Sequence, residues 1–113
     1  MKIIKDKITI DELKEMANKS FGNLVKAVVD VEKGVAAIDA ELHSDEEAEL
    51  IKEGSEQKNL WGINFYPDLE GEDFLEFDSM INIRPTQNNR SRGIDDPEIR
   101  KKIVNIVNKI VQR

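Results

Sequence analysis

Apolar side chains recur every three or four positions in three parts of the chain, which is the spacing of a helix face. The first part follows Thr9 and Glu12, whose separation is that of a capping box. A second capping-box spacing, at Ser44 and Glu47, precedes a short and strongly acidic part. The third part begins at Pro97, and proline suits the first position of a helix. The pattern predicts helices over residues 10–21, over 45–53, and from 97 towards the end.

Between these helices, apolar and polar side chains alternate, as they do in half-buried strands. The alternating segments lie at residues 25–31, 35–42, 60–67 and 74–85, with a further short strand at 2–4. The first two flank Gly34, in a turn sequence typical of a β-hairpin, and the next two predict another antiparallel pair. The predicted order is αββαββα, with a mainly antiparallel four-stranded sheet.

Strand alternation also predicts that one face of this sheet carries nearly all of its apolar side chains. The three helices would cover that face and give a two-layer α+β sandwich. The other face would be open and polar, and would hold Asp30, Asp39, Glu41, His43, Asn64, Tyr66, Glu76, Asp78, Asn82 and Arg84. We expect a single compact domain over residues 1–113, a length that can bury one core.

Charge is unevenly distributed along the chain, whose net charge is −6. Residues 39–83 carry a net charge of −12, whereas residues 84–113 carry +5. The acidic total argues against nucleic acid as a partner, because nucleic-acid binding needs a basic footprint. The chain has no cysteine and no apolar run of the length of a membrane span or signal peptide. We therefore expect a cytoplasmic protein without a membrane partner.

The polar loop after residue 83 is the first candidate site. It holds Arg84, Arg90 and Arg92, and guanidinium groups bind phosphates and carboxylates through paired hydrogen bonds. Neutral groups would complete a ligand site, namely Gln87, Asn88 and Asn89 in the loop with Asn64 and Asn82 on the sheet. The same arginines could instead neutralise the acidic segment, most directly at Glu41, Glu76 and Asp78, and both interpretations stay open.

A divalent metal site formed by Asp39, Glu41 and His43, the one histidine of the chain, is the second candidate. On a strand these side chains would project from the same face, and carboxylates and imidazoles are metal ligands. They would span too long a distance for one ion unless the strand bends, and Glu76 or Asp78 would have to complete the set. A solvated sheet face gives the same alternation, so our first interpretation includes no cofactor.

Three stretches, VKAVVD…AIDAELHSDEE, LWGINFYP and FDSMINIRPTQNNRSRGIDDPEIRKKI, resemble a small prokaryotic domain family of unknown function. The resemblance covers most of the chain, and IRPTQNNRSRG is its most distinctive part. It implies a compact cytosolic domain and brings no activity, cofactor or catalytic residue with it.

Three functions from different classes fit these features. The leading one is a small binding module, without chemistry of its own, that uses the polar face and the arginine loop to bind a protein or a small anionic ligand. The second is a metal-dependent hydrolase of phosphate esters, in which Asp39, Glu41 and His43 hold the ion and Arg90 and Arg92 neutralise the phosphate. The third is a self-associating domain, a homodimer in which the loop of one copy meets the acidic face of the other.

Overall fold

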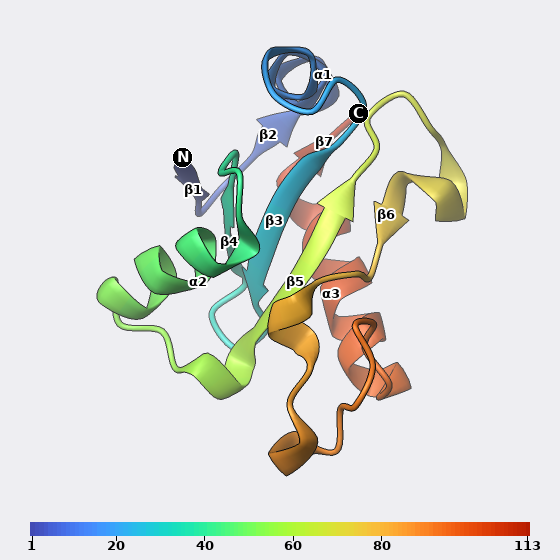
Figure 1. Ribbon diagram of the computed structural model, residues 1–113. Coiled ribbons are helices and arrows are strands. Elements are labelled where there is room, and N and C mark those ends of the chain that lie inside the picture. The colour runs from blue at the N-terminus through green and yellow to red at the C-terminus, as the bar shows by residue number, and fades with distance from the viewer.

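The computed structural model describes residues 1–113 and contains a five-stranded antiparallel sheet and three α-helices (Figure 1). In order across the sheet, the strands are β1 (Lys2–Ile4), β4 (Val35–Ile38), β3 (Val25–Asp30), β5 (Leu60–Phe65) and β6 (Leu75–Glu76). A separate parallel pair joins β2 (Ile8–Thr9) to β7 (Val111–Gln112). The helices are α1 (Ile10–Lys19), α2 (His43–Lys52) and α3 (Pro97–Ile110). Short 3-10 turns are η1 (Gln57–Asn59), η2 (Gly71–Phe74), η3 (Met80–Asn82) and η4 (Pro85–Gln87).

Local sequence signals account for the ends of several elements. The predicted capping box is confirmed, because the Glu12 amide donates to Thr9 Oγ1 at 3.1 Å and the Thr9 amide donates to Glu12 Oε1 at 3.3 Å. Asp96 caps α3 by accepting a hydrogen bond of 2.9 Å from the Glu98 amide. The hairpin of β3 and β4 turns at Gly34, whose φ of 70° favours glycine. The second predicted capping box is wrong, because α2 begins at His43 without a side-chain cap.

Both faces of the sheet are covered, which corrects the expectation of a two-layer fold with one open, polar face. α1 and α3 pack against one face, over a core that includes Trp61 and Phe65 of β5. α2 packs against the other face, where its Leu50 joins Val28 and Ala37 in a second, smaller core. In Figure 1, α2 lies in front of the sheet and α3 behind it. The second face is thus partly apolar, and α2 removes that part from water.

The two hairpins meet through β3 and β5, so β4 and β6 lie on opposite sides of this central pair. β1 pairs with β4 at one edge, so the sheet has five strands instead of the four expected. None of the helices combines the length and the apolar character that a membrane span needs.

Beyond β6 the chain leaves the sheet, although the sequence predicts a strand over residues 74–85. The side chain of Asn82 takes the place of that strand. Its Oδ1 accepts from the Gly62 amide at 2.8 Å, and its Nδ2 donates to the Gly62 carbonyl at 3.0 Å. Gly62 allows this approach, since a Cβ atom there would lie 2.4 Å from Ser79 Cβ. A side-chain amide therefore closes this part of the edge of β5.

Candidate functional site

Arg84, the first arginine of the loop, is bonded to its own chain. Its Nη1 donates to the Gln57 carbonyl at 2.6 Å, and its Nη2 donates to the Leu60 carbonyl. Its Nε donates to the Ile81 carbonyl at 3.1 Å, and the guanidinium lies 4.2 Å from the centre of the Trp61 ring. Burial lowers the pKa of Arg84, as expected for a cation that has lost water contacts. These contacts occupy Arg84 in holding the loop against β5.

Two asparagines of the predicted ligand set also serve the loop itself. Asn89 is 2% exposed, and its Nδ2 donates to the carbonyls of Asn82 at 2.7 Å and Gly93 at 2.8 Å. Its Oδ1 accepts from the Asp95 amide at 2.7 Å. With Asn82 bound to β5, the two buried amides fix the path of the loop.

The other predicted loop residues are exposed. Gln87 Nε2 donates to the Lys58 carbonyl at 3.1 Å, and Asn88 adopts a left-handed conformation with φ of 61°. The Arg90 amide donates to Asp95 Oδ2 at 3.1 Å, whereas its guanidinium makes no ion pair. Arg90 is therefore the one loop arginine whose guanidinium makes neither an ion pair nor a hydrogen bond within the chain.

Asp39, Glu41 and His43 do not share a strand, because β4 ends at Ile38. Asp39 has a left-handed φ of 68°, and His43 is the first residue of α2. No three histidine, aspartate or glutamate side chains of the structure lie together as a metal set. The strand geometry predicted for the metal site is therefore wrong.

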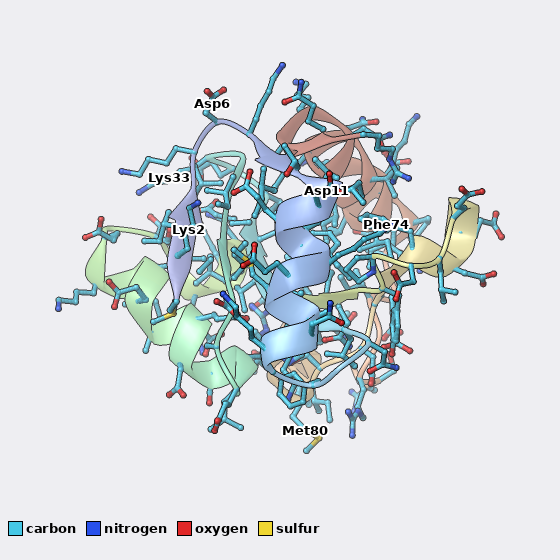
Figure 2. All side chains as sticks on the ribbon, turned by 90° about the horizontal axis from the view of Figure 1, so that it is seen from above. Lys2, Asp6, Asp11, Lys33, Phe74 and Met80 are labelled. Atoms are coloured by element: carbon cyan, nitrogen blue, oxygen red, sulfur yellow. The ribbon has the colours of Figure 1, made fainter.

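A cavity of about 380 Å³ opens on the α2 side of the sheet, above β3, β5 and β6. Its polar lining is Lys26, His43, Ser44, Asn64, Tyr66, Glu76, Asp78, Ser79 and Arg92. Two exposed apolar side chains, Leu42 and Met80, also line it, and Figure 2 shows Met80 projecting from the molecule. This cavity brings together three predicted site residues that are far apart in the sequence, His43, Asn64 and Arg92. We call it the polar cavity.

The floor of the polar cavity is a row of three side chains across three neighbouring strands. Lys26 on β3 pairs with Asn64 on β5, and Asn64 pairs in turn with Glu76 on β6. Directly paired residues lie on the same face of a sheet. A cation and a carboxylate therefore flank one amide, which is 5% exposed.

Hydrogen bonds fix the carboxylate side of this row. Asn64 Nδ2 and the Tyr66 hydroxyl both donate to Glu76 Oε1 at 2.9 Å. Burial raises the pKa of Tyr66, and the adjacent Glu76 carboxylate raises it further. Arg92 Nε and Nη2 donate to the two carboxylate oxygens of Asp78 at 2.8 and 3.1 Å, the self-pairing that the sequence raised as one option. Glu76 therefore supplies the unbalanced negative charge, because the charge of Asp78 is matched.

His43 lies at the opposite, α2 side of the cavity. Its Nε2 lies 2.8 Å from the Ile63 carbonyl, which can only accept, so this nitrogen carries the proton. Burial lowers the pKa of His43 and outweighs the bond to Ile63, which raises it, while the charge of Lys26 lowers it further. The imidazole is thus neutral at pH 7, with an acceptor at Nδ1.

Sequence reasoning missed Lys26, Ser44 and Tyr66 as members of the site. The alternation of apolar and polar residues predicts that Tyr66 lies on the polar face and that Lys26, on the strand predicted at residues 25–31, points to the same face. The sequence pattern therefore held a signal for both residues. The sequence held no such signal for Ser44, because this residue lines the cavity only as a result of where α2 starts.

Comparison with known proteins identifies a family for this chain. No curated protein and no solved structure matches it. Residues 2–110 match the family described as Protein of unknown function (DUF5674), and the chain therefore belongs to that family.

Proposed function

We propose that the protein is a binding module for a small zwitterion, such as an amino acid or a short peptide, held in the polar cavity. The row of Lys26, Asn64 and Glu76 carries this proposal. It provides a cation on one side of the cavity and a carboxylate on the other, with a buried amide between them. A ligand with both charges would complement both sides.

The start of α2 strengthens the positive side. No side chain caps the helix at Leu42, and the first amides of a helix have no partner within it. His43 and Ser44, at this end of the helix, line the cavity. The Lys26 ammonium and the positive end of the helix dipole would both favour a carboxylate there, although Asp45 in the first turn offsets part of the dipole.

The negative side of the polar cavity depends on Glu76. Only Oε1 of Glu76 accepts hydrogen bonds within the chain, which leaves Oε2 for an ammonium group. The exposed apolar side chains of Leu42 and Met80 would cover the ligand's apolar part. The volume of about 380 Å³ lies in the range of small-molecule sites.

The spacing of the charges guides the choice of ligands. Residues paired across antiparallel strands have Cα atoms about 5 Å apart, so Lys26 and Glu76 are about 10 Å apart at the backbone. Their side chains can lean inward, but the charges of a longer zwitterion fit this spacing better than those of glycine. Glycine, 4-aminobutyrate and glycylglycine therefore form a series in which the distance between the ammonium and the carboxylate differs.

Assigned ¹⁵N NMR spectra, titrated with each of these compounds and with pooled amino acids, test the proposal. We expect shifts to concentrate at Lys26, His43, Ser44, Asn64 and Glu76. No shift at millimolar ligand, or shifts confined to other surfaces, would contradict it.

Matched variants make the test specific. Lys26→Gln and Glu76→Gln should each weaken binding about tenfold or more, the equivalent of one charge contact of about 1.4 kcal/mol. Lys33→Gln in the hairpin turn and Glu70→Gln near η2 remove the same charges outside the cavity and should leave the affinity unchanged. Equal losses in both pairs would show that net charge, not the cavity, determines binding.

A further inference from the structure

A second cavity, of about 640 Å³, lies between α3 and the segment of residues 71–77. In Figure 1, β6, which belongs to this segment, lies beside β5, and α3 lies behind the sheet. The apolar residues of the cavity are Phe74, Leu75, Phe77, Val104 and Val107. Val107 and Phe74 are buried, whereas Val104 is 38% exposed, so an apolar strip is open to solvent. We call this cavity the apolar groove.

Three cations border the apolar groove: Arg100, Lys101 and Arg113. None of them belongs to an ion pair of the chain. Arg113 lies 4.4 Å from the centre of the Phe74 ring, and Arg100 donates to a backbone carbonyl. The net charge of the chain is −6. Three cations without carboxylate partners around one apolar strip therefore make this part of the surface positive, opposite in sign to the protein as a whole.

The cations lie at both ends of the groove. Lys101 is near the start of α3, and Asn108, which also lines the groove, is near its end. Seven residues of helix span about 10 Å. Arg113 follows β7, beyond the C-terminal end of α3. An apolar strip of about this length therefore has a positive charge at each end.

We propose that the apolar groove binds a small apolar organic anion, an aliphatic or aromatic carboxylic acid. The apolar strip would hold the hydrocarbon part of such a molecule, and Lys101 or Arg113 would bind its carboxylate. The volume of the groove fits a small molecule. The single acid on its lining, Glu72, leaves the rim positive and disfavours cationic ligands.

The groove is independent of the polar cavity, although both use the segment at β6. Leu75 and Phe77 line the apolar groove, whereas Glu76 and Asp78 line the polar cavity. Side chains alternate in this extended segment, so the two sets point to opposite sides. Variants in one site should therefore leave the other unchanged, and failure of one proposal is separable from failure of the other.

Anilinonaphthalene sulfonate, an apolar aromatic anion whose fluorescence increases in apolar surroundings, is a direct probe of the intact protein. We expect saturable binding at one site, displaced by decanoate and not by decyltrimethylammonium of the same chain length. The double variant Lys101→Glu with Arg113→Glu should weaken binding of the probe about tenfold or more. Lys109→Glu is the matched control, since it reverses a charge on α3 outside the groove and should have no effect.

Val104→Asp provides a second variant at an exposed position, where the fold tolerates a polar side chain. It should also weaken binding of the probe about tenfold or more, with an amide spectrum that is unchanged outside the groove. The proposal is overturned if the probe does not bind, if the cationic amphiphile displaces it equally well, or if the control variant weakens it equally. A dimer in sedimentation experiments that the double variant dissociates would overturn it too, since a second copy would then occupy the groove.

Discussion

At the scale of single residues, the arginine loop contains groups with different tasks. Arg84 is held by three carbonyl groups and an aromatic ring, and Arg92 is paired with Asp78. Neither Arg84 nor Arg90 belongs to an ion pair, but only the Arg90 guanidinium also lacks hydrogen bonds to the chain. The sequence could identify the cluster of arginines, but it could not show their different partners, because two of the carbonyls that bind Arg84, those of Gln57 and Leu60, belong to a distant segment.

Replacing Arg84 by lysine should therefore destabilise the protein. Lysine cannot reproduce the planar set of donors, so partly buried carbonyls, those of Ile81 and Leu60, would lose partners at a cost of about 1–3 kcal/mol. Arg90→Lys, the matched control in the same loop, should change the free energy of unfolding by less than about 0.5 kcal/mol. Urea unfolding of both variants measures the difference, and equal effects would contradict the structural role of Arg84.

Glu46 determines a pH dependence of stability. It is fully buried on α2, and its burial raises its pKa from 4.5 to about 9. The hydrogen bond that it accepts from the Ala40 amide at 3.1 Å only partly opposes this increase. The folded state therefore binds the proton more tightly than the unfolded state does. The contribution of Glu46 to the free energy of unfolding should fall as the pH rises from about 4.5 to about 9.

Glu46→Gln should remove this decline, because the amide is neutral at every pH and its oxygen can still accept from Ala40. Urea unfolding from pH 5 to pH 9 would measure it, with Glu53→Gln at the exposed end of α2 as the control. If the free energy of unfolding of Glu46→Gln fell with pH as steeply as that of the wild type, other groups would be the cause of the decline.

At the scale of elements, the side chain of Asn82 replaces a strand. It bonds to both backbone groups of Gly62, and its Nδ2 also donates to the Arg92 carbonyl at 2.9 Å. Asn82→Asp keeps the shape but removes the donors, and it places a carboxylate opposite two carbonyl oxygens. We expect a loss of about 2 kcal/mol or more in the free energy of unfolding.

Asn88→Asp is the control for that prediction, since Asn88 is exposed and aspartate tolerates the left-handed conformation. It should change stability by less than about 0.5 kcal/mol. Hydrogen exchange at the Gly62 amide provides a local measurement, and protection that survives Asn82→Asp would contradict the role of this side chain.

The elements that sequence patterns predicted are those specified by near neighbours. The capping box at Thr9 and the turn at Gly34 depend on residues within a few positions. Most of the errors concern contacts between distant segments, although the capping-box spacing of Ser44 and Glu47 is a local signal that failed, because α2 begins at His43. Alternation over residues 74–85 indicated a strand, but the approach of Ser79 and Asn82 to Gly62 determines the path of that segment. The position of α2 likewise depends on Val28 and Ala37, two apolar residues on a face that otherwise looked polar.

Part of the candidate site was predictable for the same reason. Alternation placed Asn64, Tyr66 and Glu76 on one face, and this grouping holds in the polar cavity. Pairing of β3 with β5, which brings Lys26 beside Asn64, could not be read from alternation, because several strand orders satisfy the same pattern.

At the scale of the whole molecule, the chain separates its charges without cancelling them. Only one ion pair, Asp78 with Arg92, joins the acidic segment of residues 39–83 to the basic segment of residues 84–113. The fold instead places two cavities on the two faces of the β5–β6 edge. One presents opposite charges across a row of three residues, and the other presents cations around apolar side chains.

Under the proposed function, the polar cavity must recognise both charges of one ligand. Isothermal titration calorimetry with the tightest-binding zwitterion of the series, its N-acetyl derivative and its methyl ester tests this claim directly. Acetylation removes the ammonium that Glu76 would bind, and esterification removes the carboxylate that Lys26 and the start of α2 would bind. We predict that each derivative loses about tenfold or more in affinity. A derivative that binds as tightly as the parent zwitterion would contradict the claim, because one of the two charged sides would then have no part in recognition.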